Sequence, residues 1–357
     1  SMGATGSGWK AIAMIAGTPY NSLTAWKTAS GQDASSLNVL PVFVSGSDLH
    51  LDNTSNASLF QKGTYFTEAP DDIDGFTRHP VTAAMGCDEF VPVNTAYWIG
   101  KTSTDWTDIT NWEDNKIPSG TVSVTIAGGF NNLPVISGTQ AVNGLSLLSP
   151  GAPPVLTLAS GSTLQINGAM SKTGAAYIIA SDATIECNGS AAQTIPATFF
   201  QNNVVKNLVI GNSSAAGLTL AGTLEITRSL TFGTSGLKLN TGDFLVLRST
   251  ASETAWVGDL TGKTISGQAT VERYIPTGVN HGKSWQFLSV PVNASQTIQQ
   301  AWQEGNLPMA NGTPGYGTII TGNVSGATSL GFDIGTSAAS GPGMKVFNEL
   351  TNSWVGV

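Results

Sequence analysis

The chain has 357 residues and a formal net charge of −8, and only 11% of its residues are charged, against about 25% in an average globular protein. Its 42 glycines and 40% hydrophobic content indicate many short strands joined by tight turns, and they exclude intrinsic disorder. The sequence contains no basic cluster and no apolar run of about 18 residues, which excludes nucleic-acid binding and a membrane-spanning helix within this chain.

Residues 1–92 are predicted to form a first β-rich module. The segment 38–52, NVLPVFVSGSDLHLD, begins with an apolar run and ends in alternation that places His50 on a solvent-facing side. A polar stretch over 53–71 follows. The sequence DDIDGF at 71–76 then predicts a tight turn, because Asp side chains cap nearby amides and Gly75 can adopt positive φ.

The acidic turn is the candidate metal site of the sequence. Asp71, Asp72 and Asp74 could bind calcium through carboxylate oxygens, which are the ligands that this ion prefers. The turn lacks the full spacing and the distal Glu of an EF-hand loop. The alternative is therefore a turn whose carboxylates satisfy their own backbone, with Arg78 neutralising them. We expect no other cofactor.

Three groups of residues in the first module carry a resemblance. They are Asp48–Leu51, Asp72–Gly75 with Arg78, and Gly86 with Asp88–Phe90. On these residues, positions 20–90 resemble the C-terminal end, the choice-of-anchor Q region, of a pectin-lyase-like right-handed parallel β-helix. The resemblance implies that residues 1–92 are the C-terminal part of such a helix, and that this chain is a segment of a longer protein.

A tryptophan-rich stretch follows at 97–129. Trp98, Trp106 and Trp112 lie near Asp105 and Asn111, and exposed aromatic rings with amides and carboxylates beside them are suited to sugar binding. These three residues are the candidate sugar platform. The alternative is that the three indoles pack the first strands of the domain.

The middle module, 97–264, is repetitive. Residues 155–170, VLTLASGSTLQINGAM, resemble residues 217–230, GLTLAGTLEITRSL, and in both the apolar residues alternate with polar ones. One such unit cannot bury its apolar face alone, so successive units must stack. A β-solenoid and a β-sandwich both satisfy this requirement, and we favour the solenoid. The fold class expected overall is all-β: the end of a right-handed parallel β-helix followed by β-solenoid or β-sandwich modules.

Residues 265–357 are predicted to form a third β-rich module that this segment truncates. We expect a helix over 297–305 and a hairpin over 344–357 that turns at Thr351-Asn352. Cys87 and Cys187 are predicted to be two separate buried thiols, with a long-range disulfide as the alternative. No Gly-x-Ser-x-Gly motif is present, and we expect no catalytic residue in this chain.

Further segments resemble secreted, adhesin-like surface proteins of Bacteroidetes. They are the stretch with Trp98 and Trp106, residues 190–212, and residues 265–305. The resemblance implies a non-enzymatic segment of a large bacterial protein that is extracellular or on the cell surface. Its role would be structural or adhesive, with a surface glycan or protein as partner. The alternative is a fragment of a polysaccharide lyase or hydrolase whose catalytic turns lie upstream.

Overall fold

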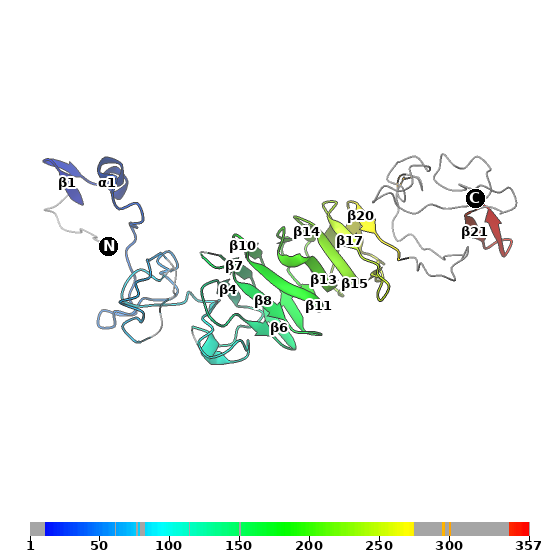
Figure 1. Cartoon of the computed structure of the whole chain (residues 1–357). Helices are drawn as coiled ribbons and strands as arrows, with labels where there is room; N and C mark the ends of the chain where they lie inside the picture. The colour runs from blue at the N-terminus through cyan, green and yellow to red at the C-terminus, as the bar shows by residue number, and fades with distance from the viewer. Residues whose placement is uncertain are drawn as a thin grey trace. The chain divides into compact units, whose positions relative to one another are not determined.

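The computed structural model describes residues 11–60, 62–75, 78, 83–113, 115–149, 151–274, 295–296, 300 and 343–356. The chain divides into two compact units, residues 1–281 and 282–357. Nearly all regular elements of the described residues are β-strands, which confirms the expected all-β fold class (Figure 1).

The described part of the first unit starts with a small antiparallel hairpin and a short helix. The hairpin pairs β1 (Ala13–Ile15) with β2 (Thr18–Tyr20), and the helix is α1 (Leu23–Ser30). The Ser22 hydroxyl caps the helix by accepting a hydrogen bond from the Ala25 N–H at 3.2 Å. Gly31, with φ of 65°, ends it.

Residues 95–271 form a parallel β-solenoid of about six turns, in which strands from successive turns lie side by side in three columns (Figure 1). The first column consists of two four-stranded sheets in succession. Its strands are β3 (Thr95–Trp98), β4 (Ser123–Ala127), β7 (Leu145–Leu148) and β10 (Met170–Lys172), then β12 (Gln193–Ile195), β14 (Leu218–Leu220), β16 (Lys238–Asn240) and β19 (Thr264–Ser266).

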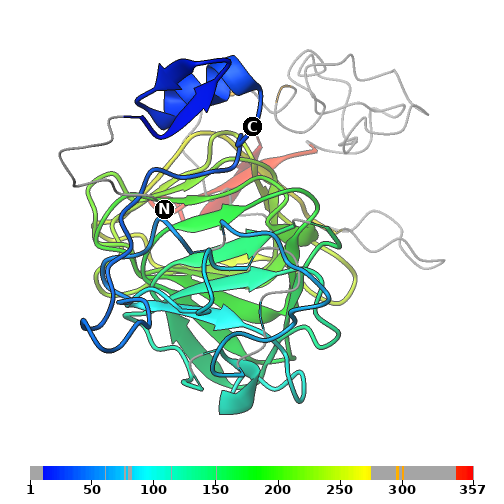
Figure 2. The same cartoon turned by 90° about the vertical axis from the view of Figure 1, so that its left-hand side faces the viewer.

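The second and third columns belong to one ten-stranded sheet, because its longest strands run through both columns. Figure 2 shows the strands of successive turns stacked next to one another, with the colour changing from cyan through green to yellow. The strands are β5 (Val135–Ile136), β6 (Thr139–Val142), β8 (Val155–Leu158), β9 (Thr163–Ile166), β11 (Tyr177–Cys187), β13 (Phe200–Ile210), β15 (Leu224–Phe232), β17 (Leu245–Leu247), β18 (Trp256–Val257) and β20 (Ala269–Val271).

The strand pairs within the solenoid are all parallel, which decides between the two architectures left open by the sequence. A β-sandwich is built from antiparallel strands, whereas a solenoid pairs each strand with its equivalent in the next turn. The solenoid prediction is therefore confirmed.

The core is continuous because the inward positions of each turn lie directly above those of the previous turn. In the third column Ile185 pairs with Leu164 on one side and with Leu208 on the other, and all three are 0% exposed. Each such side chain contributes about 1.5–3 kcal/mol when fully buried. One cluster of buried residues joins every turn from Ala96 to Ala255.

The two cysteines have different environments, and both are free thiols. Cys187 occupies an inward position between Ile166 and Ile210, and burial raises the pKa of its thiol to about 12. It therefore serves as a small core residue, as predicted. Cys87 is exposed, so the expectation of a second buried thiol was wrong.

The two similar segments of the sequence occupy different faces of the solenoid. Leu156 lies in β8 of the second column, whereas Leu218 lies in β14 of the first column. Both are buried, as predicted. All three faces carry the same alternation of apolar and polar residues, so local similarity does not identify which face a segment forms.

The boundaries of the solenoid differ slightly from the predicted 97–264. It begins at Thr95 and includes β19 and β20, because β19 pairs with β16 and β20 pairs with β17. Residues 265–271 therefore belong to the solenoid and not to the third module. In the second unit, β21 (Lys345–Asn348) and β22 (Ser353–Gly356) form the predicted hairpin. The predicted helix over 297–305 falls outside the described residues, except for Gln300.

The described part of residues 32–94 contains no helix or strand, only isolated bridges such as that of Phe43 with Leu51. Its loops surround a small core of Leu51, Leu59, Ala84 and Phe90. The parallel stack thus lies further along the chain than the β-helix expected over 1–92. That residues 20–90 close a preceding β-helix stays a prediction.

Leu208→Ala tests the continuous core. Leu208 is 0% exposed in the middle of the stack, so its truncation should reduce the free energy of unfolding by about 2–5 kcal/mol in urea denaturation. Thr194→Ala, at an exposed position of β12, is the matched control and should change it by less than about 0.5 kcal/mol. Equal effects of the two substitutions would contradict a packed core.

Candidate functional site

The three candidate sugar-binding tryptophans pack against one another inside the protein. Trp98 comes from β3, Trp106 from the following loop, and Trp112 from the end of the 3-10 helix η1 (Ile109–Asn111). The ring centroids of Trp98 and Trp112 are 5.1 Å apart and those of Trp106 and Trp112 are 4.7 Å apart, both with edge-to-face geometry. All three side chains are 0% exposed.

Buried polar groups fix the loop that carries these rings. Asn111 is 0% exposed. Its side-chain carbonyl oxygen accepts hydrogen bonds from the N–H groups of Thr102 and Ser103 at 2.9 and 3.0 Å. Its amide donates to the Asp105 carbonyl oxygen at 3.0 Å. The Trp112 indole N–H donates to the Trp106 carbonyl oxygen at 2.8 Å. The loop is therefore held by its own side chains.

The sugar platform predicted at Trp98, Trp106 and Trp112 is thus incorrect, because a sugar ring stacks only on an exposed aromatic face. The alternative, packing of the first strands, is what the structure has. The three rings belong to the main core cluster, and Asp105 forms a parallel bridge to Val135 at the start of the second column. They cover the first end of the core, which every solenoid has to protect.

Trp106→Ala tests this role. Removal of a fully buried indole should reduce the free energy of unfolding of the solenoid by about 3–5 kcal/mol, measured by urea denaturation followed by circular dichroism. Trp256→Ala removes an indole that is 52% exposed and should cost much less. A cost for Trp106→Ala as small as that for Trp256→Ala would refute the packing role.

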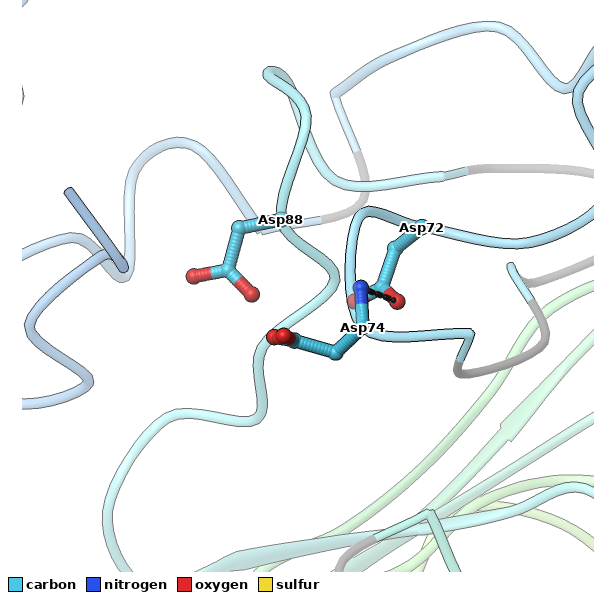
Figure 3. A group of neighbouring side chains, drawn as sticks. All are labelled: Asp72, Asp74 and Asp88. Carbon is cyan, nitrogen blue, oxygen red and sulfur yellow. Dashed lines mark hydrogen bonds between the residues drawn. The ribbon is translucent and has the colours of Figure 1, made fainter.

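The second candidate site is an acidic cluster, defined here as Asp72, Asp74 and Asp88. One carboxylate oxygen of each lies within 4.8 Å of the others, and among the described residues this is the one such group. Figure 3 shows the carboxylates of Asp74 and Asp88 pointing toward one another from different loops. Two of the three residues predicted for calcium, Asp72 and Asp74, belong to this cluster. The third member is Asp88 and not the predicted Asp71.

The carboxylates of the cluster also tie the backbone of separate loops together. Asp72 accepts hydrogen bonds from the N–H groups of Asp74 and Glu89, both at 2.9 Å. Asp88 accepts one from the N–H of Leu51 at 2.7 Å. These bonds join the loops around residues 51, 72 and 88, and they add to the few backbone bonds there, such as that from the Ile73 N–H to the Cys87 carbonyl oxygen at 3.0 Å.

Asp88 is the buried member, with 6% of its surface exposed. Burial is the main influence on the pKa of its carboxyl group and raises it; the Leu51 N–H and His50 oppose the increase, and Asp72 and Asp74 reinforce it. The ionised form of Asp88 is therefore the costly one in the folded protein.

His50 compensates part of this negative charge. Its Nε2 lies 2.8 Å from a carboxylate oxygen of Asp74, and its Nδ1 contacts the Asp48 carboxylate. The hydrogen bond with Asp48 is the main cause that raises the pKa of His50, and the charge of Asp74 adds to it. The sequence placed His50 on a solvent-facing side, and the half-exposed ring does lie there, but its two carboxylate partners were not predicted.

Arg78 has a different partner from the one predicted. Its guanidinium pairs with Glu89 at 3.3 Å and donates hydrogen bonds to the backbone carbonyls of Gly86 and Asp71 at 3.1 and 3.3 Å. Glu89, in turn, accepts hydrogen bonds from the N–H of Ala84. Arg78 therefore braces the loop at 84–89, and its guanidinium forms an ion pair with Glu89.

The acidic cluster has the charge and oxygen atoms that calcium requires, but its other contacts compete with a cation. Calcium takes six to eight oxygen ligands, and here three carboxylates are available. Asp74 already pairs with His50, whose ring repels a cation when it is protonated. Since the same carboxylates bond to backbone N–H groups, the observed contacts account for the cluster as a loop tie. Calcium binding stays a prediction.

The pKa of His50 provides a test of the loop tie. A raised pKa means that the stabilising contribution is complete below the ordinary value of 6.5 and is lost as the pH rises through the folded value. His50→Gln should therefore destabilise the protein more at about pH 5.5 than at about pH 8.5. The His50 ring should titrate above 6.5 in NMR spectra, and closer to 6.5 after Asp48→Asn. An unshifted His50 in the unsubstituted protein would contradict the contacts described.

No known family or relative identifies the chain. No family model matches the sequence, no curated protein matches it, and no solved structure matches it. Among the described residues, no helix is long and apolar enough to cross a membrane. The fold and the local geometry therefore carry the functional argument.

Proposed function

We propose that this chain is a non-enzymatic segment of a large secreted or cell-surface bacterial protein, with a structural or adhesive role. The observation that supports the proposal is the single hydrophobic core that passes through the turns of the solenoid without interruption. Each turn contacts only its neighbours, so a stack of this kind makes a body that spaces or presents other parts of a protein.

The outward side chains strengthen the same body. On the first column, Ser171 donates a hydrogen bond to Ser146 at 3.0 Å, and Ser266 donates to the Asn240 side chain at 2.8 Å. These bonds join neighbouring turns through uncharged groups, so salt should weaken them little. Few charges and many bonded strands suit a protein that works outside the cell, where proteases and variable ionic strength are common.

The proposal predicts resistance to proteolysis. Proteases cut segments that can unfold locally. The strands of the solenoid are bonded on both sides except at its ends and between β10 and β12 in the first column. Limited digestion with proteinase K, read by mass spectrometry, should leave the strands between residues 95 and 271 intact, with cuts confined to loops. Early cleavage inside β11, β13 or β15 would contradict a structural role.

The enzyme alternative is tested on the same protein. Incubation with soluble plant and bacterial polysaccharides should produce no new reducing ends and no absorbance from unsaturated sugars. Turnover that survives purification of the chain, and that disappears on substitution of a residue of this chain, would replace the structural proposal by a catalytic one.

A further inference from the structure

Trp256 is an aromatic residue on the outside of the solenoid. It begins β18 and is 52% exposed, while the next residue, Val257, packs against the main core. Because successive side chains of a strand point to opposite faces, the Trp256 indole faces away from the core. A single exposed indole is not unusual by itself, so its surroundings decide what it can bind.

A row of uncharged polar residues extends from Trp256 across the outer face of the third column. Strand register pairs Trp256 with Ser229, Ser229 with Asn207, Asn207 with Thr184, and Thr184 with Thr163. We call these five residues the outer row. Neighbouring strands are about 4.8 Å apart, so the row presents hydroxyl and amide groups at regular intervals beside one aromatic ring.

Hydrogen bonds hold the members of the outer row in position. The Ser229 hydroxyl donates to the Asn207 side-chain carbonyl at 2.7 Å, and the Asn207 amide donates to the Thr184 hydroxyl at 3.2 Å. Ser229 is 8% exposed, whereas Thr163, Thr184 and Asn207 are half-buried and can reach a ligand. The groups are preorganised, which reduces the entropy lost on binding.

Most of the charges close to the outer row are paired, as in the ion pair of Lys206 with Asp182 at 2.8 Å. Arg228, which precedes Ser229, lies 3.6 Å from the carboxylate of Glu253. In the neighbouring outward row, the Glu186 carboxylate accepts a hydrogen bond from the uncharged amide of Gln165 at 2.9 Å. With two ion pairs and no cluster of like charges, the surface suits a neutral ligand that offers both hydroxyl groups and an apolar face.

We propose that the outer row binds a neutral polysaccharide, with one sugar ring stacked on Trp256 and sugar hydroxyls bonded to Asn207, Thr184 and Thr163. Sugar rings expose C–H groups on their faces and hydroxyls at their edges, which matches an indole beside a row of amides and hydroxyls. The inference rests on the proposed adhesive role and names the surface that would perform it. It moves the sugar contact from the buried tryptophans near the start of the solenoid to an exposed one near its other end.

Affinity electrophoresis of the full chain tests this inference. The probes are native gels that contain hydroxyethyl cellulose, xyloglucan, galactomannan or dextran, with polygalacturonate as the acidic comparison. At least one neutral polymer should retard the protein. Trp256→Ala should weaken the apparent affinity about tenfold or more, since the bound sugar ring would no longer cover an indole. Trp256→Tyr should retain most of the retardation, and Thr184→Val should reduce the affinity roughly two- to tenfold.

Trp354→Ala is the matched control, because Trp354 is 51% exposed but lies in the C-terminal hairpin. It should leave retardation unchanged. The inference is overturned if no neutral polymer retards the protein, if only polygalacturonate does, or if Trp256→Ala binds as well as the unsubstituted protein. In each of these cases, intact protease resistance over residues 95–271 would leave the structural proposal standing, whereas its loss would remove that proposal independently.

Discussion

The stacking of equivalent inward side chains is the constraint on which the rest of the structure depends. A turn of this solenoid has an apolar interior that it cannot bury alone, and its strands bond only to the turns before and after it. Parallel register must therefore be kept from turn to turn, because a shift by one residue would turn each inward side chain to the solvent. Irregular places, such as the bulges of β11 and β13, occur between the columns and leave the inward positions aligned.

The same constraint explains why the first end of the solenoid is unlike its middle. The first turn has no preceding turn to cover its core, and three packed indoles cover it instead. The Asn111 side chain accepts hydrogen bonds from the backbone N–H groups of the loop that carries two of these indoles. The loops before Thr95 are held together mainly by side-chain hydrogen bonds. They contain little regular structure, and carboxylates such as Asp88 supply the hydrogen bonds that a sheet would otherwise provide.

The sequence predicted what depends on local alternation and missed what depends on distant packing. The inward positions of Leu156, Leu164 and Leu218 follow from alternation, and so does the solenoid, because repeated units must stack. The face on which a unit lies does not follow, since the three faces share one pattern. The acidic turn was found, but Asp88 was not, because its position depends on contacts between separate loops, such as its hydrogen bond from the N–H of Leu51, 37 residues away. The sequence left open whether the three tryptophans bind a sugar or pack the first strands, because their burial depends on the turn that carries them.

Hydrogen exchange measured by mass spectrometry tests the continuous stack most directly. If one core joins the turns, the backbone amides of the strands from β4 to β17 should exchange slowly and with similar protection, because they become accessible only when the stack opens. The loops before Thr95 should exchange faster. A sharp loss of protection between β10 and β12, where the first column changes from one sheet to the next, would show two separate bodies and contradict the account.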